Sequence, residues 1–365
     1  MLPNSIGSLV VLRYLDISDT GIKRLPDTIC NLYNLQTLIL CSCKNLIELP
    51  VLIGNLINLR HLDISETSIK ELPMQIVRLE SLWTLTCFVV GKIHVGLSIK
   101  ELRKFPHLQG KLTIMNLHNV NDAMEEYDAD LKSKEHIEEL VLERGKLAED
   151  SQIEKDVLNA LRSSINLRKL DINLYGGTSF PSWLGDSLFS NMVFVRITNC
   201  SYCMTLPAMG KLPSLKDLVI FDMRMLETIG PEFYGMTGGS SNSSFQPFPS
   251  LETLHFQNMP NLKEWLPVEG NTVPFASLKS LELDNCPELR GHFLSLLSCV
   301  KEIKILSCDH LLATPVTLHS LCSINRINID GDFDSEWSLL ASDSPCLLQY
   351  VSIWNCSMLQ SLPKM

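Results

Sequence analysis

The chain has 365 residues, 45% of them hydrophobic, and its 31 basic and 41 acidic residues give a formal net charge of −10. This length and apolar content suffice for a sizeable core, which excludes an extended disordered tail. The negative charge argues against partners such as nucleic acid or anionic lipid, because both need basic surfaces. No apolar run reaches the roughly 20 residues of a membrane span, and the first residues, MLPNSIGSLV, lack the basic and apolar regions of a signal peptide. We therefore expect an intracellular protein, cytoplasmic or nucleocytoplasmic, with no stable membrane insertion.

One apolar pattern, LxxLxL, recurs along the whole chain. Its first four copies begin at Leu12, Leu35, Leu59 and Leu82, at intervals of 23, 24 and 23 residues. This period is typical of leucine-rich repeats, which span about 20 to 29 residues each. The sequence therefore predicts a single solenoid over residues 1–365 with about fourteen repeats. The later copies begin at Gln109, Ile137, Leu167, Met192, Leu215, Leu251, Leu278, Val300, Ile324 and Leu348.

Each copy predicts one short strand. The second and third apolar residues of LxxLxL are two apart, so they share one face while the residues between them face the other way. Apolar residues at +11 and +14 from the first Leu, such as Leu46 and Leu49, return to the core on the outer side, and Pro50 then interrupts regular hydrogen bonding. The predicted fold is an α/β solenoid, a leucine-rich-repeat horseshoe with a concave parallel sheet and an irregular, short-helix convex side.

Two segments depart from the regular repeat. Ser151 and Glu154 form a capping box. The apolar residues at helical spacing, which predict an amphipathic helix on the convex side, are Ile153, Val157, Leu158 and Leu161. The interval between the ninth and tenth copies is long and contains GMTGGSSNSS, a composition typical of mobile loops. We expect a loop insertion at residues 230–250.

The cysteines follow the repeat. Five of the twelve occupy position +8, where leucine-rich repeats place an inward-pointing Asn or Cys after the strand. Cys200 and Cys203 look like half a zinc site, yet no second pair stands at suitable spacing and Cys203 replaces a core Leu. We expect structural ladder residues rather than metal ligands at Cys43, Cys200, Cys286, Cys308 and Cys356.

Motifs of catalysis are missing from the sequence. It contains no HExxH, no GxxxxGK[ST] phosphate loop and no GxSxG elbow. The prediction is therefore a protein that is not an enzyme and has no catalytic, cofactor-binding or metal-binding residues.

The outward strand positions, +1, +2, +4 and +6, form the candidate partner-binding face. Side chains there do not build the core, so large aromatic residues leave apolar area exposed, as interface hot spots do. The alternative is that some of them only pack against neighbours across the sheet. The candidates on this concave face are Tyr14, Trp83, Phe88, Phe194, Arg196, Phe221, His255, Tyr350 and Trp354.

Several longer phrases point to one family. The segments LPDTICNLYNLQTLILCSC, HLQGKLTIMNLHNV with HIEELVLER, YGGTSFPSWLG and IGPEFYG resemble the repeat region of plant intracellular immune receptors of the coiled-coil, nucleotide-binding, leucine-rich-repeat class. These receptors are disease-resistance proteins. Arg144 departs from the pattern, which often has Trp after HIEELxL. The coiled-coil and nucleotide-binding domains are absent from the chain, which begins and ends within a repeat, so we expect a fragment.

The resemblance implies a protein-recognition module. In that family the repeats help to hold the receptor inactive and take part in recognising pathogen effectors, directly or through a guarded host protein. ADP or ATP is then expected only in the nucleotide-binding domain, and that domain is itself an expected partner of the repeats. A leucine-rich-repeat adaptor that recruits substrates to a ubiquitin ligase remains the alternative. Candidate interdomain residues, all basic and early in the chain, are Arg13, Lys23, Arg24, Arg60 and Arg78.

Overall fold

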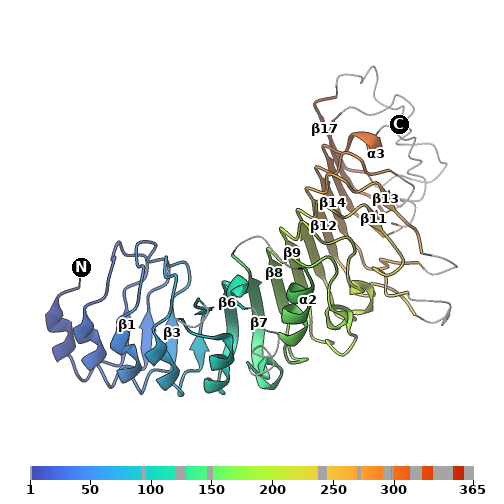
Figure 1. The fold of residues 1–365 in the computed structure, drawn as a ribbon. Coiled ribbons are helices and arrows are strands. Elements are labelled where there is room, and N and C mark those ends of the chain that lie inside the picture. Colours follow the sequence, from blue (N-terminus) through green and yellow to red (C-terminus); the bar gives the residue numbers. More distant parts are fainter. Residues whose placement is uncertain are drawn as a thin grey trace. The chain divides into compact units, whose positions relative to one another are not determined.

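The chain folds into stacked coils, most of which contribute one short strand (Figure 1). They form two compact units, the first comprising residues 1–148 and 156–172 and the second residues 149–155 and 173–365. A single solenoid over 1–365 with an insertion at 230–250 stays a prediction, and residues 237–244 of that stretch lie outside the described residues. The computed structural model describes residues 2–92, 96–120, 129–145, 151–236, 245–268, 273–290, 297, 299–312, 323–331 and 348–356.

Parallel strands build the first unit, with one register shift between Gly110 and Lys111. The strands are β1 (Tyr14–Asp16), β2 (Thr37–Ile39), β3 (His61–Asp63), β4 (Thr84–Leu85), β5 (Cys87–Val89), β6 (Gln109–Met115), β7 (His136–Glu143) and β8 (Lys169–Asn173, with residue 173 in the second unit). In the four-stranded sheet β1 to β4, Leu15 is aligned with Leu38, and Leu38 with Leu62. Because equivalent leucines stack, the apolar face of each strand continues into the next.

The second unit repeats this arrangement. Its strands are β9 (Phe194–Thr198), β10 (Asp217–Phe221), β12 (Thr253–Gln257), β14 (Ser280–Asp284), β15 (Glu302–Leu306), β16 (Arg326–Asp330) and β17 (Tyr350–Trp354). Neighbours in this order pair in parallel without a register shift. A separate two-stranded sheet joins β11 (Thr228–Ile229) to β13 (Glu264–Trp265). The leucine-rich-repeat solenoid predicted from the sequence is confirmed as the fold class.

A residue with left-handed backbone ends most strands. Position +7 has φ of 54° at Asp222, 57° at Asn258 and 52° at Asn285, a region that Asn and Asp tolerate better than other non-glycine residues. The amide of Asn258 donates to the Asp222 carboxylate at 2.7 Å, and the amide of Asn285 donates to the Asn258 side-chain oxygen at 2.8 Å. These side chains therefore tie consecutive coils together, a role that the sequence analysis did not assign.

The outer side consists mainly of short 3-10 helices. Proline precedes several of them, and the Pro50 carbonyl accepts the first hydrogen bond, from the Ile53 N–H at 3.1 Å. Neighbouring helices stack closely, since a Cβ on Gly54 would lie 2.3 Å from the Gln75 carbonyl oxygen. The 3-10 helices are η1 (Asn4–Ser8), η2 (Asp27–Asn31), η3 (Val51–Asn55), η4 (Met74–Arg78), η5 (Ile99–Lys104), η6 (Leu117–Asn119), η7 (Leu131–Ser133), η8 (Ser182–Gly185) and η9 (Met209–Lys211).

Two α-helices also occur in the described ranges, α2 (Ser151–Ala160) and α3 (Asp309–Leu312). Helix α2 confirms the predicted amphipathic helix, since Val157, Leu158 and the following Leu161 are buried, but Ile153, predicted to share their face, is exposed. No helix in the described part of the chain is long and apolar enough to cross a membrane.

An aromatic cluster fills the core beside the long interval of the second unit. The Phe233 ring lies 4.9 Å from that of Phe248, and the Phe248 ring stacks on Phe275 at 5.0 Å. The Trp265 indole N–H donates to the Tyr234 hydroxyl at 2.7 Å, and this hydroxyl donates to the Leu266 carbonyl at 3.2 Å. Burial raises the pKa of Tyr234 well above its usual range. Residues 233 and 234 are thus core residues of the extended repeat.

Candidate protein-binding surface

The outward side chains at +1, +2, +4 and +6 line the open face of each sheet, and Trp83 is the largest of them in the first unit. Trp83 immediately precedes β4, and its side chain is 40% exposed. The Arg60 guanidinium lies 4.9 Å from the indole centroid, and the His61 ring meets the indole edge-on at 5.9 Å. Trp83 is therefore held in place by two side chains of the preceding coil although it remains accessible.

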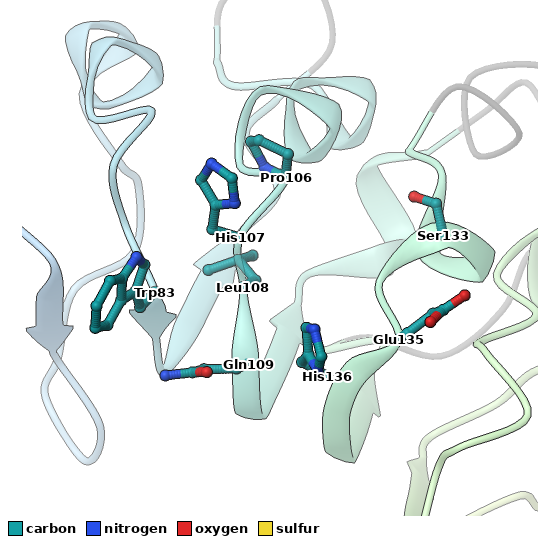
Figure 2. A pocket seen from close by; sticks show the side chains of 8 residues that line it. All are labelled: Trp83, Pro106, His107, Leu108, Gln109, Ser133, Glu135 and His136. Atoms are coloured by element: carbon teal, nitrogen blue, oxygen red, sulfur yellow. The ribbon is translucent and has the colours of Figure 1, made fainter.

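A hollow of about 370 Å³ opens beside Trp83 (Figure 2). The segments that line it are neighbours in the stack of coils, because the Gln109 N–H donates to the Trp83 carbonyl at 2.8 Å and Gln109 is aligned with His136. The indole and Leu108 offer apolar surface, while imidazole, amide and carboxylate groups surround it. Such a mixture suits an apolar side chain of a partner with polar neighbours. The lining residues are Trp83, Pro106, His107, Leu108, Gln109, Ser133, Glu135 and His136.

A second exposed aromatic pair lies on β17 in the second unit. Tyr350 and Trp354 are four residues apart on this strand, so both side chains project from the same face. They are 46% and 48% exposed. The Arg326 guanidinium lies 4.8 Å from the Tyr350 ring centroid. Arg326 and Tyr350 thus repeat the arrangement of Arg60 and Trp83 in another pair of adjacent coils.

Most candidates of the middle repeats are half-buried, although Arg196 is exposed. Phe194 and Phe221 are half-buried, and the Arg196 guanidinium lies 5.7 Å from the Phe194 ring. His255 is also half-buried, with Nδ1 4.0 Å from the Glu282 carboxylate. Neighbours cover much of the surface of the half-buried side chains, as expected if they mainly pack across the sheet face.

The prediction for Phe88 is wrong. Counting from Leu82 placed its side chain outward at +6, whereas the ring is completely buried. Strand β4 ends at residue 85, β5 begins at residue 87, and Phe88 is aligned with the inward-facing Ile114. The residue between them, Thr86, belongs to neither strand: its N–H still donates to the Leu62 carbonyl at 3.3 Å, while its hydroxyl donates to Asp63 Oδ1 at 3.0 Å. This one-residue shift in the alternation turns Phe88 to the core.

The basic candidates for interdomain contact have separate surroundings. Arg13 and Lys23 are exposed. The Arg24 guanidinium lies 3.0 Å from the Glu48 carboxylate, and both side chains are more than half exposed. Arg60 contacts Trp83 as described above, and the Arg78 guanidinium donates to the Asn55 side-chain oxygen at 3.5 Å. Their role stays a prediction.

The +8 cysteines lie where the repeat places them. Cys43, Cys200, Cys286 and Cys308 are fully buried, and Cys356 is half-buried. The four buried thiols donate to nearby carbonyls, that of Cys43 to the Ile17 carbonyl at 3.1 Å. A hydrogen bond with Cys308, together with burial, raises the pKa of Cys286.

The Cys200 and Cys203 pair is part of the core. Both side chains are fully buried, and the Cys203 thiol donates to the Gly177 carbonyl at 2.9 Å. Burial raises the pKa of Cys203 well above its usual value. Among the described residues, no group of three or more His, Cys, Asp or Glu side chains is placed to hold a metal ion.

Known proteins share these repeats. A family model described as R13L1/DRL21 LRRs matches residues 99–223, and one described as Plant disease resistance protein RPS2-like, leucine-rich repeats, matches residues 166–312. The chain is 44% identical over 274 residues to the putative disease resistance protein At3g14460 of Arabidopsis thaliana, covering 73% of this chain and 19% of that protein. It is 40% identical over 333 residues to the putative disease resistance RPP13-like protein 1 of the same plant, covering 88% and 30%.

The chain therefore spans less than a third of the length of either relative. Among solved structures, the functional domain of InlJ from Listeria monocytogenes, which includes a cysteine ladder, is similar with a TM-score of 0.51. It is 14% identical, and the match covers 94% of this chain and 70% of that one. This likeness shows the fold.

Proposed function

The chain carries the leucine-rich repeats of plant disease-resistance proteins, and from this premise we propose that it is the protein-recognition module of such a receptor. Its partner is a pathogen effector or a guarded host protein, met in the cytoplasm or nucleus. The module itself uses no cofactor, since ADP or ATP belongs to the nucleotide-binding domain of a complete receptor.

The observation that carries this proposal is the exposed pair Tyr350 and Trp354 beside Arg326. Tyr, Trp and Arg are the residues most enriched at interface hot spots. Here they project from one sheet face, where they contribute little to the core, and Arg326 already orients the Tyr350 ring. An oriented aromatic side chain loses less conformational freedom when a partner binds it. These late repeats therefore form the effector-binding surface.

The test uses a full-length receptor that contains this region and an elicitor to which it responds. Replacing Tyr350 and Trp354 by Ala should leave protein levels unchanged and weaken binding by about 2 kcal/mol or more per true anchor, roughly thirtyfold. Tyr33→Ala is the matched control, since Tyr33 is 51% exposed but lies in the turn before β2. Unchanged binding and signalling in the Tyr350 and Trp354 variants would refute the assignment.

The early repeats hold the receptor inactive in this proposal. Arg13 and Arg60 are outward residues of the first unit and would face an acidic surface of the nucleotide-binding domain. Reversing both to Glu should raise signalling without an elicitor. Lys44→Glu is the control, an exposed charge change outside the proposed set. Equal basal signalling in all three proteins at equal abundance would contradict the proposal.

A further inference from the structure

A row of charged residues borders a hollow of about 420 Å³ in the second unit. Lys216, Glu252, Lys279 and Lys301 stand immediately before β10, β12, β14 and β15, four strands that are neighbours in the sheet. The row is continuous along the backbone, because the Lys279 N–H donates to the Glu252 carbonyl and the Lys301 N–H donates to the Lys279 carbonyl, both at 2.8 Å. All four residues line the hollow.

The single carboxylate in this row is shared by two lysines. The Glu252 carboxylate lies 3.8 Å from Lys216 Nζ and 2.5 Å from Lys279 Nζ. The hydrogen bond from Lys279 lowers the pKa of Glu252, so this side chain is ionised at neutral pH. The hollow thus holds three ammonium groups against one carboxylate, a net charge of +3 − 1 = +2.

Lys301 completes the row without an acidic neighbour in it. Its side chain is exposed, and the +1 residues of the two adjacent coils are Lys279 and Asn325. Lys279 already engages Glu252, so the ammonium of Lys301 adds an uncompensated positive charge beside it. An incoming anion would relieve the repulsion between these two lysines, by an amount that depends on salt because both are exposed.

Carboxylates already lie between basic side chains elsewhere on the same sheet face. The Glu282 carboxylate lies 3.3 Å from Lys304 Nζ and 4.0 Å from His255 Nδ1, and these two residues come from the strands on either side. Glu252 has the same arrangement between Lys216 and Lys279. Twice, therefore, a carboxylate lies between basic side chains of neighbouring coils.

We propose that the hollow bordered by Lys216, Lys279 and Lys301 binds Asp or Glu side chains of an acidic segment in the partner protein. The inference rests on the proposed recognition function and specifies the partner's chemistry. A carboxylate bound between Lys279 and Lys301 would extend the alternation of charges along the row. The hydroxyls of the neighbouring Ser250 and Ser277 donate to backbone carbonyls and so do not compete for the lysines. Electrostatic contacts of this kind favour fast, salt-dependent association.

The test measures fluorescence anisotropy of a fluorescein-labelled peptide of alternating Glu and Gly residues, titrated with the full chain. We expect binding that weakens as salt is raised from 50 to 500 mM, and at least tenfold weaker binding by Lys301→Glu. Lys263→Glu is the matched control, since Lys263 is also an exposed lysine of the same unit and pairs with Glu227 away from the hollow. It should change affinity less than twofold. Circular dichroism verifies that both variants are folded.

Three results would overturn the proposal: equal affinity of the Lys301→Glu variant and the unmodified chain, equal affinity for a Gln and Gly peptide, or tighter binding of inorganic phosphate than of the acidic peptide. The last would mark a phosphate site instead. The outcome is separable from that of the proposed function. If the acidic peptide fails while the Tyr350 and Trp354 variants lose elicitor binding, only this inference is wrong, and the converse result would refute only the aromatic surface.

Discussion

Replacing Phe88 by Ala tests the largest disagreement between sequence pattern and structure. The ring is completely buried. A Phe side chain buries about 150–250 Å², which at about 25 cal/mol per Å² corresponds to roughly 4–6 kcal/mol of transfer free energy. A compact denatured state lowers this by about 10–40%, whereas the cavity that is left adds to the cost. We expect the free energy of unfolding to fall by about 3–5 kcal/mol.

Urea unfolding followed by circular dichroism measures this loss, and hydrogen exchange in β5 and β6 shows whether it arises in the first unit. Trp83→Ala is the control, because this larger side chain is 40% exposed and should cost far less. If Phe88→Ala were as stable as the unmodified chain, Phe88 would be on the surface, as simple counting from Leu82 predicts, and the shift at Thr86 would be wrong.

Three further predictions concern the coils and their thiols. Gly54→Ala should destabilise the protein by about 1–3 kcal/mol in urea unfolding, because its Cβ would meet the Gln75 carbonyl at 2.3 Å, whereas Gly21→Ala, with nothing nearer than 4.0 Å, should be neutral or slightly stabilising. Equal stability of the two variants would count against close stacking. A maleimide should label half-buried Cys41 before buried Cys43 in the native protein, and mass spectrometry giving the reverse order would contradict the ladder. Burial raises the pKa of Cys87 to about 11 from an ordinary 9.0, so between these pH values the thiol stays protonated in the folded state but ionises in the unfolded state. The free energy of unfolding should therefore fall as the pH rises from 9 to 11. If a Cys87→Ala variant showed the same fall, the effect would have another origin.

Much of the fold could be predicted because the repeat imposes the same environment on equivalent positions. The leucines at +3 face inward in coil after coil, and Leu218, Leu254 and Leu281 align as the spacing predicts. The +8 cysteines follow the same rule. Counting from the start of each copy predicts the burial of four of them, while Cys356 is only half-buried.

Local interruptions limit the same counting. The alternation shifts at Thr86, whose hydroxyl donates to Asp63 and accepts from the Ile64 N–H, at 3.0 Å in both cases. The sequence LTCFVV does not distinguish this arrangement from a regular strand, because the residue that would face the core is apolar in both cases, Cys87 in the regular strand and Phe88 in the structure. The left-handed position +7 was visible as recurring Asn and Asp, but its side-chain ladder depends on the distance between coils, which LxxLxL does not specify.

The binding surfaces depend on a relation that lies between repeats rather than within one. In parallel coils without a register shift, a residue stands beside the residue one period later. Arg60 and Trp83 both occupy +1, and Arg326 and Tyr350 both occupy +2, so each guanidinium lies over the aromatic ring of the following coil. Either aromatic residue read alone is only an exposed side chain.

The same relation produces the lysine row, although its members are unevenly spaced in the sequence. Glu252 meets Lys216 across the longest interval of the chain and Lys279 across an ordinary one. Within that interval Phe233 and Tyr234 pack into an aromatic core, and the strands that flank the interval pair without a register shift. The length of an interval can therefore vary without disturbing the charges on the open face, because the register of the strands determines which side chains meet there.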